Sequence, residues 1–324
     1  MQKITTEIPD VQYFAAETGL NASLAERKIG FDKLILDNNL SRKKLTVVCG
    51  PCAADDVSAV AEYLRGLKEL ADKYDNLLVV ARVYTAKPHS DGTGYGGMMF
   101  GDGSIVRGIA DCRKMMVDCL NVGLPVADEI LYPDMFKYFA DLVSYAFIGA
   151  RSSEDALHRA VASSLDIACG VKNGTDGDIK KTVDSLYAVA NPCVYPLNGN
   201  LLQTSGNKSA HIVLRGGVVD GVFAPNFDTG ALSTAKKLLS ARGLNDFVMV
   251  DLSHANSGKV AVNQIGNALS VASDPLVDGV MVESYIHDGK GGGYGISRTD
   301  DCLGLAKTDQ VLRILSDGFS KRFE

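Results

Sequence analysis

Eight short apolar runs, separated by helical patterns, set the strongest limit on how this chain can fold. Several runs are apolar nearly throughout, as is typical of parallel strands that are covered on both faces. Amphipathic segments such as 56–74 and 104–123 lie between them. This alternation predicts an α/β fold with a parallel sheet. The expected strands are residues 45–49, 77–83, 124–128, 144–148, 166–170, 211–214, 247–251 and 279–283.

Length and linkers favour one large unit over two domains. The chain has 324 residues, and α/β barrels commonly run to ~250 residues as a single unit. No linker rich in Gly, Pro and Ser interrupts the pattern, so we expect a (β/α)8 TIM barrel over residues 41–324. Residues 1–40 are expected to form an N-terminal arm followed by a helix over 21–39. Residues 190–210 carry Pro and Gly in place of a helix and predict an extra hairpin or excursion.

The polar residues at the expected strand ends separate a closed barrel from an open doubly wound sheet, which has the same periodicity. Active sites of α/β barrels lie where the strands deliver their C-terminal residues. Charged groups inside a structural core are costly unless they are paired. A barrel mouth would gather them around one cavity. The residues are Cys52, Arg82, Lys87, Asp128, Glu129, Arg151, Lys172, Arg215, His254 and Glu283.

These polar residues fall into two chemical sets. Five cations (Arg82, Lys87, Arg151, Lys172 and Arg215) suit a small ligand that carries both carboxylate and phosphate. The second set combines Cys52, His254 and Glu283 with a carboxylate from a later loop, Asp300 or Asp301. A mixed set of sulfur, nitrogen and oxygen ligands suits a borderline divalent ion such as Mn, Fe, Co or Zn.

A series of motifs resembles the type I 3-deoxy-D-arabino-heptulosonate 7-phosphate (DAHP) synthase family over about residues 45–310. The motifs in order are GPC at 50–52, RVY..KP at 82–88, IGAR at 148–151, KNGTDG at 172–177, LRGG at 214–217, DLSHANSGK at 251–259, GVMVES at 279–284 and YGISRTDDC at 294–302.

The resemblance implies a (β/α)8 barrel that binds a divalent metal. It also implies that the protein is a transferase, which condenses phosphoenolpyruvate with erythrose 4-phosphate in the shikimate pathway of aromatic amino acid biosynthesis. The implied metal ligands are Cys52, His254, Glu283 and Asp300, with Asp300 preferred over Asp301 because it directly follows Thr299. The implied phosphoenolpyruvate residues are Arg82, Lys87, Ala150, Arg151, Lys172 and Arg215. Lys87 is the expected proton donor to the new hydroxyl, and Glu129 is the expected carboxylate near the reacting water.

The sequence departs from the family pattern where the acceptor phosphate is expected to bind. His89 and Ser90 stand where the family has Arg and Thr. A histidine carries its charge only when protonated, so a permanent guanidinium is lost. A sister synthase that uses phosphoenolpyruvate with a different aldose phosphate is therefore an alternative function.

A further alternative belongs to another class of protein. Cys49-Gly50-Pro51-Cys52 has the spelling of a thioredoxin-like redox motif. A non-catalytic sensor that binds the same anionic ligand is another alternative. The presence of all the implied metal ligands argues against it.

Composition limits the partners and the location. The net charge of −6 disfavours nucleic acid and anionic membranes as partners. The first residues lack the apolar core of a signal peptide, no apolar stretch is long enough to span a membrane, and the seven cysteines are an odd number. We therefore expect a cytoplasmic protein. Separately, we expect a homo-oligomer (dimer or tetramer).

Overall fold

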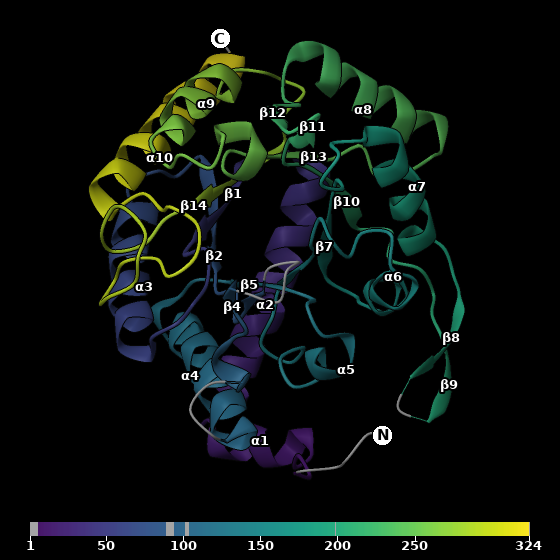
Figure 1. The fold of residues 1–324 in the computed structure, drawn as a ribbon, viewed down its shortest axis with the longest axis vertical. Coiled ribbons are helices and arrows are strands. Elements are labelled where there is room, and N and C mark those ends of the chain that lie inside the picture. The colour runs from purple at the N-terminus through teal and green to yellow at the C-terminus, as the bar shows by residue number, and fades with distance from the viewer. Residues whose placement is uncertain (1–5, 89–93, 101–103, 198, 324) are drawn as a thin grey trace.

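The centre of the molecule is a closed barrel of eight parallel strands (Figure 1). The structure is a computed structural model, and it describes residues 6–88, 94–100, 104–197 and 199–323. Around the barrel the strand order is β1-β14-β13-β10-β7-β6-β5-β2. All eight predicted runs form barrel strands, so the (β/α)8 TIM barrel is confirmed and the open sheet is wrong. The strands are β1 (Leu45–Gly50), β2 (Leu77–Arg82), β5 (Val126–Glu129), β6 (Tyr145–Ile148), β7 (Ala168–Lys172), β10 (Ala210–Leu214), β13 (Val248–Asp251) and β14 (Gly279–Glu283).

Helices between the strands cover the outside of the barrel. The side chains of Asp56 and Ser104 accept backbone N–H groups at the first turns of two of these helices, which fixes where they begin. The helices are α3 (Val57–Ala71), α4 (Ile105–Val122), α5 (Pro133–Phe136), α6 (Ala156–Ser163), α7 (Ile179–Ala190), α8 (Thr229–Ala241), α9 (Asn263–Val271) and α10 (Leu305–Ser320), with single 3-10 turns η1 (Met98–Phe100), η2 (His254–Ser257) and η3 (Lys321–Phe323).

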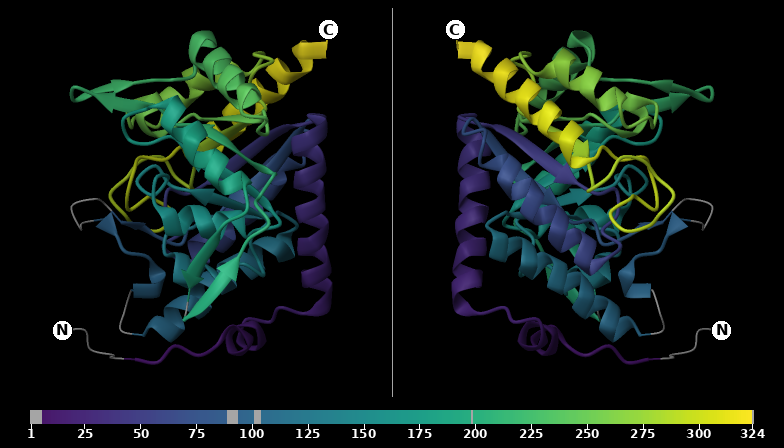
Figure 2. Two further views of the ribbon diagram at one scale, coloured as in Figure 1. Left: turned by 90° about the vertical axis from the view of Figure 1, so that its right-hand side faces the viewer. Right: turned by 90° about the vertical axis from the view of Figure 1, so that its left-hand side faces the viewer.

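The N-terminal segment closes one end of the barrel. Helix α2 (Ala22–Ser41) is capped by Asn21, and its Ile35 is buried among the side chains of the barrel interior. Its Asn38 donates a hydrogen bond to Thr46 Oγ1, at the start of β1. Figure 2 shows α2 on the side of the barrel opposite to the long loop that follows β14. The expected arm also contains a short helix, α1 (Val11–Glu17), which its weak periodicity did not reveal.

Among the described residues, three two-stranded sheets lie outside the barrel. The predicted excursion is the hairpin of β8 (Val194–Leu197) and β9 (Asn200–Gln203). Two others follow the C-terminal ends of barrel strands: β3 (Lys87–Pro88) with β4 (Gly94–Tyr95), and β11 (Gly217–Val219) with β12 (Val222–Ala224). These two hairpins therefore belong to the mouth of the barrel.

Within the described ranges, none of the helices combines the length and the apolar character that crossing a bilayer requires.

Candidate active site

On several strands, the row of inward-facing apolar residues ends in a polar residue at the mouth of the barrel. Along β2, Leu78 and Val80 pack in the barrel interior, and the next residue of the same parity is Arg82. Because side chains alternate along a strand, the same step of two residues places a polar group at the end of other strands. The corresponding pairs are Ala127 and Glu129, Val213 and Arg215, Met249 and Asp251, and Met281 and Glu283.

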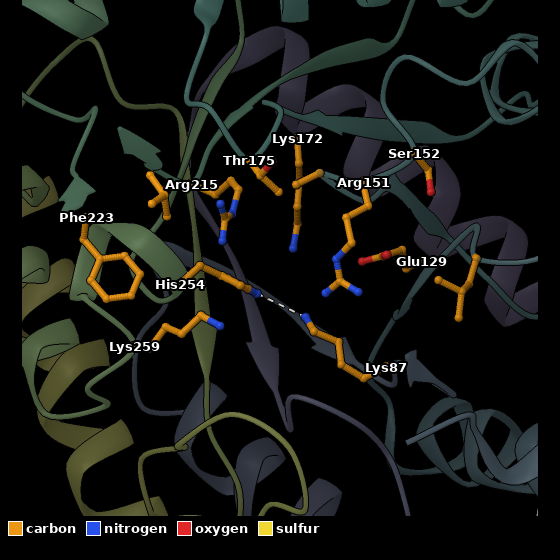
Figure 3. A pocket seen from close by; sticks show the side chains of 13 residues that line it. Lys87, Glu129, Arg151, Ser152, Lys172, Thr175, Arg215, Phe223, His254 and Lys259 are labelled. Atoms are coloured by element: carbon orange, nitrogen blue, oxygen red, sulfur yellow. Dashed lines mark hydrogen bonds between the residues drawn. The ribbon is translucent and has the colours of Figure 1, made fainter. Parts of the chain in front are cut away.

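A cavity of about 420 Å³ opens at this end of the barrel (Figure 3). Seven of the predicted site residues line it, and they come from six different strand ends. A small molecule inside would therefore meet positive charge from several directions. The seven residues are Lys87, Glu129, Ala150, Arg151, Lys172, Arg215 and His254.

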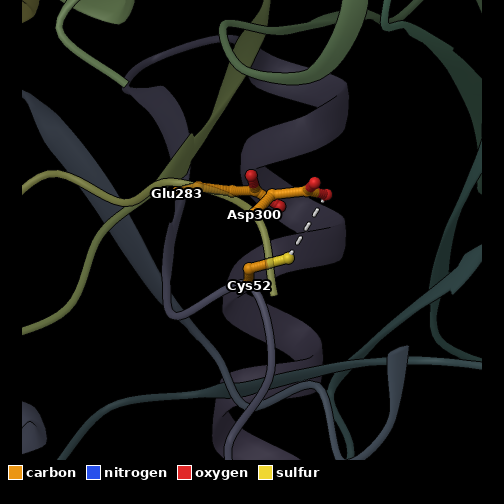
Figure 4. Close-up of side chains that lie close together, drawn as sticks. All are labelled: Cys52, Glu283 and Asp300. Carbon is orange, nitrogen blue, oxygen red and sulfur yellow. Dashed lines mark hydrogen bonds between the residues drawn. The ribbon is translucent and has the colours of Figure 1, made fainter. Parts of the chain in front are cut away.

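Three of the four predicted metal ligands converge beside the cavity. Ligand atoms of Cys52, Glu283 and Asp300 all lie within 4.8 Å of one another (Figure 4). The Cys52 thiol lies 3.7 Å from Asp300 Oδ2. Burial and the charge of Glu283 raise the pKa of this thiol to about 12. Without a bound cation the thiol therefore keeps its proton at neutral pH.

His254, the fourth predicted ligand, faces the same group. Its Nε2 lies 3.4 Å from Glu283 Oε1, and its Nδ1 lies 2.8 Å from Asp251 Oδ2. Burial lowers the pKa of His254 to about 4, so the imidazole is neutral. Lys87 Nζ, which can only donate, lies 3.1 Å from Nε2, so Nε2 is the acceptor and Nδ1 carries the proton, 2.7 Å from Ser253 Oγ. This is the tautomer that a metal ligand requires.

Two buried lysines face the cavity from neighbouring positions. Lys87 Nζ lies 3.1 Å from His254 Nε2. Burial alone would lower the pKa of Lys87, but the opposite charge of Glu283 contributes to raising it above its ordinary value, which keeps the ammonium charged. Burial lowers the pKa of Lys172 to about 8. The carboxylate of Asp251, which lies 3.4 Å from Lys172 Nζ, raises this pKa but does not offset the effect of burial.

Arg82 does not line the cavity but lies fully buried beneath the three converging ligands. Its guanidinium donates to Glu283 Oε1 at 2.9 Å and to the carbonyls of Pro51 and Cys52, both at 3.1 Å. It also stacks over the ring of Tyr84 at 3.9 Å. These contacts fix the loop that carries Cys52 relative to the carboxylate of Glu283.

The loop after β6 has a glycine where it passes the carboxylate of Glu129. A Cβ atom on Gly149 would lie 2.1 Å from Glu129 Oε1, so any larger residue at this position would displace that carboxylate. The next two residues, Ala150 and Arg151, line the cavity. The neighbouring Asp128 points elsewhere: it is buried and accepts hydrogen bonds from the backbone N–H and the hydroxyl of Thr85.

Buried asparagines hold the loop that carries Arg215. Asn173 Oδ1 accepts the backbone N–H of Arg215 at 2.8 Å, and Asn226 Oδ1 accepts that of Gly216 at 2.7 Å. Asn226 also donates to Asn173 Oδ1. Three loops far apart in the sequence are thereby fixed to one another.

Two predicted acceptor residues are not placed. His89 and Ser90 lie outside the described residues.

Sequence reasoning missed several residues that line the cavity or support it. Lys259, Val218 and Phe223 line the cavity, and Asp251 orients His254. Asp251 could have been found, because it is the inward-facing residue at the end of an apolar strand. Val218 and Phe223 gave no signal, since nothing in the sequence distinguishes their hairpin from an ordinary loop.

The thiols do not behave as a redox pair. All seven cysteines lie in the described part of the chain and are free. Cys49 is a fully buried residue of β1, and burial raises its pKa to about 11. Reactive thiols of redox motifs have lowered pKa values and are partly exposed. The thioredoxin-like reading therefore has no support at this motif.

The fold and the cavity place this protein among α/β-barrel enzymes, whose catalytic groups lie at the C-terminal ends of the strands. Comparison with known proteins narrows the class further. Residues 39–301 match the model of the DAHP synthetase I family, and the chain belongs to that family.

Relatives extend the match over nearly the whole chain. The Tyr-sensitive phospho-2-dehydro-3-deoxyheptonate aldolase of Escherichia coli (strain K12) is 37% identical over 294 residues, covering 83% of this chain and 81% of that protein. The Phe-sensitive protein of the same strain is 34% identical over 335 residues, covering 96% and 93%. A solved structure of phospho-2-dehydro-3-deoxyheptonate aldolase from Francisella tularensis SCHU S4 superposes with a TM-score of 0.92 at 30% identity, covering 99% of both chains.

Proposed function

We propose that this protein condenses phosphoenolpyruvate with erythrose 4-phosphate, giving 3-deoxy-D-arabino-heptulosonate 7-phosphate and phosphate, and that it requires a divalent metal. The observation that carries the proposal is the cation-lined cavity beside the group of Cys52 and Glu283, which are buried, and Asp300, which is partly buried. Family membership supports the same reaction. The relatives named above are all heptonate aldolases, which gives no support to a sister synthase with another acceptor.

The residues present fit a divalent ion. Two carboxylates and a thiol within 4.8 Å of one another would repel once ionised, and a cation between them would remove that repulsion. The neutral imidazole of His254 supplies a nitrogen ligand on the same side. The mixed donor set suits Mn, Fe, Co or Zn. A bound ion would act as a Lewis acid on the carbonyl oxygen of the aldehyde.

The cavity cations would bind the donor. Arg151, Lys172, Arg215 and Lys87 line one continuous cavity, and phosphoenolpyruvate carries a carboxylate and a phosphate on the same carbon atom. Guanidinium groups bind such anions through two parallel hydrogen bonds, and lysines add point charges. Held in this way, the enol carbon of the donor would face the aldehyde. Arg82 would support the site by its hydrogen bonds to the carboxylate of Glu283 and to the backbone carbonyl of Cys52.

Proton transfers follow from the positions of Lys87 and Glu129. A new bond joins the enol carbon to the aldehyde carbon, and the aldehyde oxygen takes a proton to become a hydroxyl. Lys87, charged and 3.1 Å from His254 Nε2, is placed to give that proton. Water then adds to the cationic carbon that bears the phosphate, Glu129 accepts the proton of that water, and the carbon–oxygen bond to phosphate breaks.

We further propose that the protein acts in the cytoplasm as a homo-oligomer. Large apolar side chains such as Leu40 and Leu201, which are 79% and 75% exposed, would be covered by such an assembly. Light scattering of the purified protein tests this, and a monomer at micromolar concentration would contradict it.

The experiment that tests the function measures phosphate release from phosphoenolpyruvate with a panel of four- and five-carbon aldose phosphates, with and without a chelator. We expect release with erythrose 4-phosphate, loss of release with chelator, and recovery on adding Mn²⁺ or Co²⁺. Cys52→Ala is expected to lose metal binding and activity together. A fully active Cys52→Ala variant, or activity that chelator does not touch, contradicts the metal requirement.

A further inference from the structure

We propose that Arg298 and Asp301 are positioning residues of the candidate metal site. Each fastens the loop that carries Asp300 to a segment that carries another candidate ligand: Arg298 to the loop of Cys52, and Asp301 to the turn of His254. This inference rests on the proposed function, because it assumes that the candidate ligands hold a divalent ion. The observations that carry it are two hydrogen bonds, one on either side of Asp300.

Asp300 is the candidate ligand that lies farthest along the chain from a barrel strand. Glu283 is the last residue of β14, Cys52 follows β1 by two residues, and His254 follows β13 by three. Asp300 instead belongs to the long loop of residues 284–304, between β14 and α10 (Figure 2). That loop contains six glycines, which leave the backbone free and offer no side chain to anchor it. The barrel strands alone therefore do not fix Asp300.

The first contact joins the Asp300 loop to the Cys52 loop. Arg298 Nε donates to Asp55 Oδ2 at 2.9 Å, and Tyr285 donates its hydroxyl to Asp55 Oδ1 at 3.2 Å. About half of the Arg298 side chain is exposed, but the side chain of Asp55 is only 4% exposed. A partly buried ion pair of this kind is screened less than one in open solvent. Arg298 comes two residues before Asp300, and Asp55 comes three residues after Cys52, so this pair holds two candidate ligands together.

The second contact joins the same loop to the turn after β13. Asp301 Oδ2 accepts the backbone N–H of Ala261 at 2.8 Å. That turn begins with His254, whose carbonyl accepts the backbone N–H of Lys259 at 2.8 Å. The sequence left Asp300 and Asp301 as alternative ligands. In the structure the carboxylate of Asp301 is engaged by the backbone, whereas that of Asp300 joins the ligand group (Figure 4).

The start of helix α9 extends the second contact to the end of β14. The carbonyl of Ala261 accepts the backbone N–H of Gln264 at 3.0 Å. The buried side chain of Gln264 then forms two hydrogen bonds with the backbone of Glu283, donating to its carbonyl at 3.0 Å and accepting its N–H at 2.9 Å. Asp301 is thereby linked to the backbone of Glu283 through one short turn. Asp300 thus has an anchored neighbour on each side.

Positioning of this kind sets the affinity for the ion. Without an ion, the carboxylates of Glu283 and Asp300 repel each other, which favours movement of the loop away from the site. The apparent affinity of a binding site falls in proportion to the fraction of molecules in the competent conformation. If the loss of one contact leaves the loop in place for about a tenth of the time, the affinity falls about tenfold.

The test titrates Co²⁺ into chelator-treated protein, in competition with a chelator of known affinity, and reads the absorption of thiolate-bound cobalt. The variants that remove a contact are Arg298→Met and Asp301→Ala. Asp301→Asn is the conservative variant, because its amide oxygen can still accept the N–H of Ala261. The matched control is Lys307→Met, which breaks an exposed ion pair with Asp288 of the same loop, 2.9 Å long.

Arg298→Met and Asp301→Ala are each expected to weaken Co²⁺ binding about tenfold or more, the effect typical of residues that support metal ligands. Asp301→Asn and Lys307→Met should stay within about threefold of the wild type. Three results overturn the inference: affinities of Arg298→Met and Asp301→Ala within about twofold of the wild type, equal losses in Asp301→Asn and Asp301→Ala, which would make Asp301 a ligand, or an equal loss in Lys307→Met.

A second variant keeps the test decisive if Arg298→Met folds poorly. Arg298→Met leaves the carboxylate of Asp55 nearly buried, with Tyr285 as its remaining donor. The double variant Asp55→Asn/Arg298→Met removes that charge as well. It is expected to show the same loss of about tenfold in Co²⁺ affinity, because both changes break one contact. Wild-type affinity in the double variant overturns the role of Arg298.

Cobalt binding is measured without substrates, which separates this inference from the proposed reaction. If the wild type binds Co²⁺ but releases no phosphate with any aldose phosphate, the proposed reaction fails, and the dissociation constants still decide the roles of Arg298 and Asp301. A wild type that binds no Co²⁺ overturns this inference together with the metal requirement.

Discussion

Replacing Arg82 with Met removes a buried charge and leaves its partner behind. Arg82 and Glu283 are both fully buried, and their charged atoms lie 2.9 Å apart. At an effective dielectric constant of about 20, two unit charges at that distance attract by about 6 kcal/mol. Arg82 also loses its own desolvation penalty when it is replaced. The net loss is therefore expected to be about 3–5 kcal/mol of unfolding free energy.

Urea unfolding followed by circular dichroism measures this loss. With a slope of about 3 kcal/mol per M, the midpoint should fall by about 1–2 M. The matched control is the double variant Arg82→Met/Glu283→Gln, which removes the orphaned charge as well. It should be more stable than the sum of the two single losses by about 2 kcal/mol or more. A loss below about 1 kcal/mol for Arg82→Met, or strictly additive losses, refutes the reasoning.

Two further predictions concern neighbouring strand ends. Burial raises the pKa of Asp128 to about 8, above its ordinary value of 3.8, so the folded state holds a proton that the unfolded state releases. The free energy of unfolding should therefore fall as pH rises from about 4 to 8, by up to about 1.4 kcal/mol per pH unit. Urea midpoints measured across that range test this, and Asp128→Asn should flatten the slope. An unchanged slope in the variant would show that Asp128 is ionised in the folded state. Gly149→Ala would place a Cβ 2.1 Å from Glu129 Oε1 and displace that carboxylate. The kcat should therefore fall at least tenfold, while the melting temperature drops by only a few degrees. A variant with the kcat of the wild type would mean that Glu129 has no part in the reaction.

The sequence was sufficient to predict the barrel because two separate signals identify each strand. The runs are apolar on both faces, as in Leu77–Arg82, where all six residues are buried, and each run is followed by a helix. Short elements gave no such signal. Helix α1 has seven residues with only Phe14 buried, so its periodicity is too brief to detect.

Residue chemistry alone could not place every site residue. Arg82 and Arg215 both end apolar strands, yet one is sealed beneath the site and the other lines the cavity. Their different positions depend on Glu283 and on the asparagines behind Arg215, and these contacts link distant parts of the chain. The pairing of Cys52 with Asp300 spans 248 residues and came from the family resemblance. Lys259 was missed because its position depends on two consecutive residues with positive φ.

The central claim is that Cys52 joins His254, Glu283 and Asp300 around one divalent ion, and absorption spectroscopy of Co²⁺ added to chelator-treated protein tests it most directly. A cobalt ion bound by a thiolate absorbs in the near ultraviolet by charge transfer from sulfur. We predict that this band saturates at a single Co²⁺ per chain, disappears in Cys52→Ser and persists in Cys49→Ser, whose thiol is buried against Tyr63. A band that survives in Cys52→Ser, or no saturable binding by the wild type, would contradict the account.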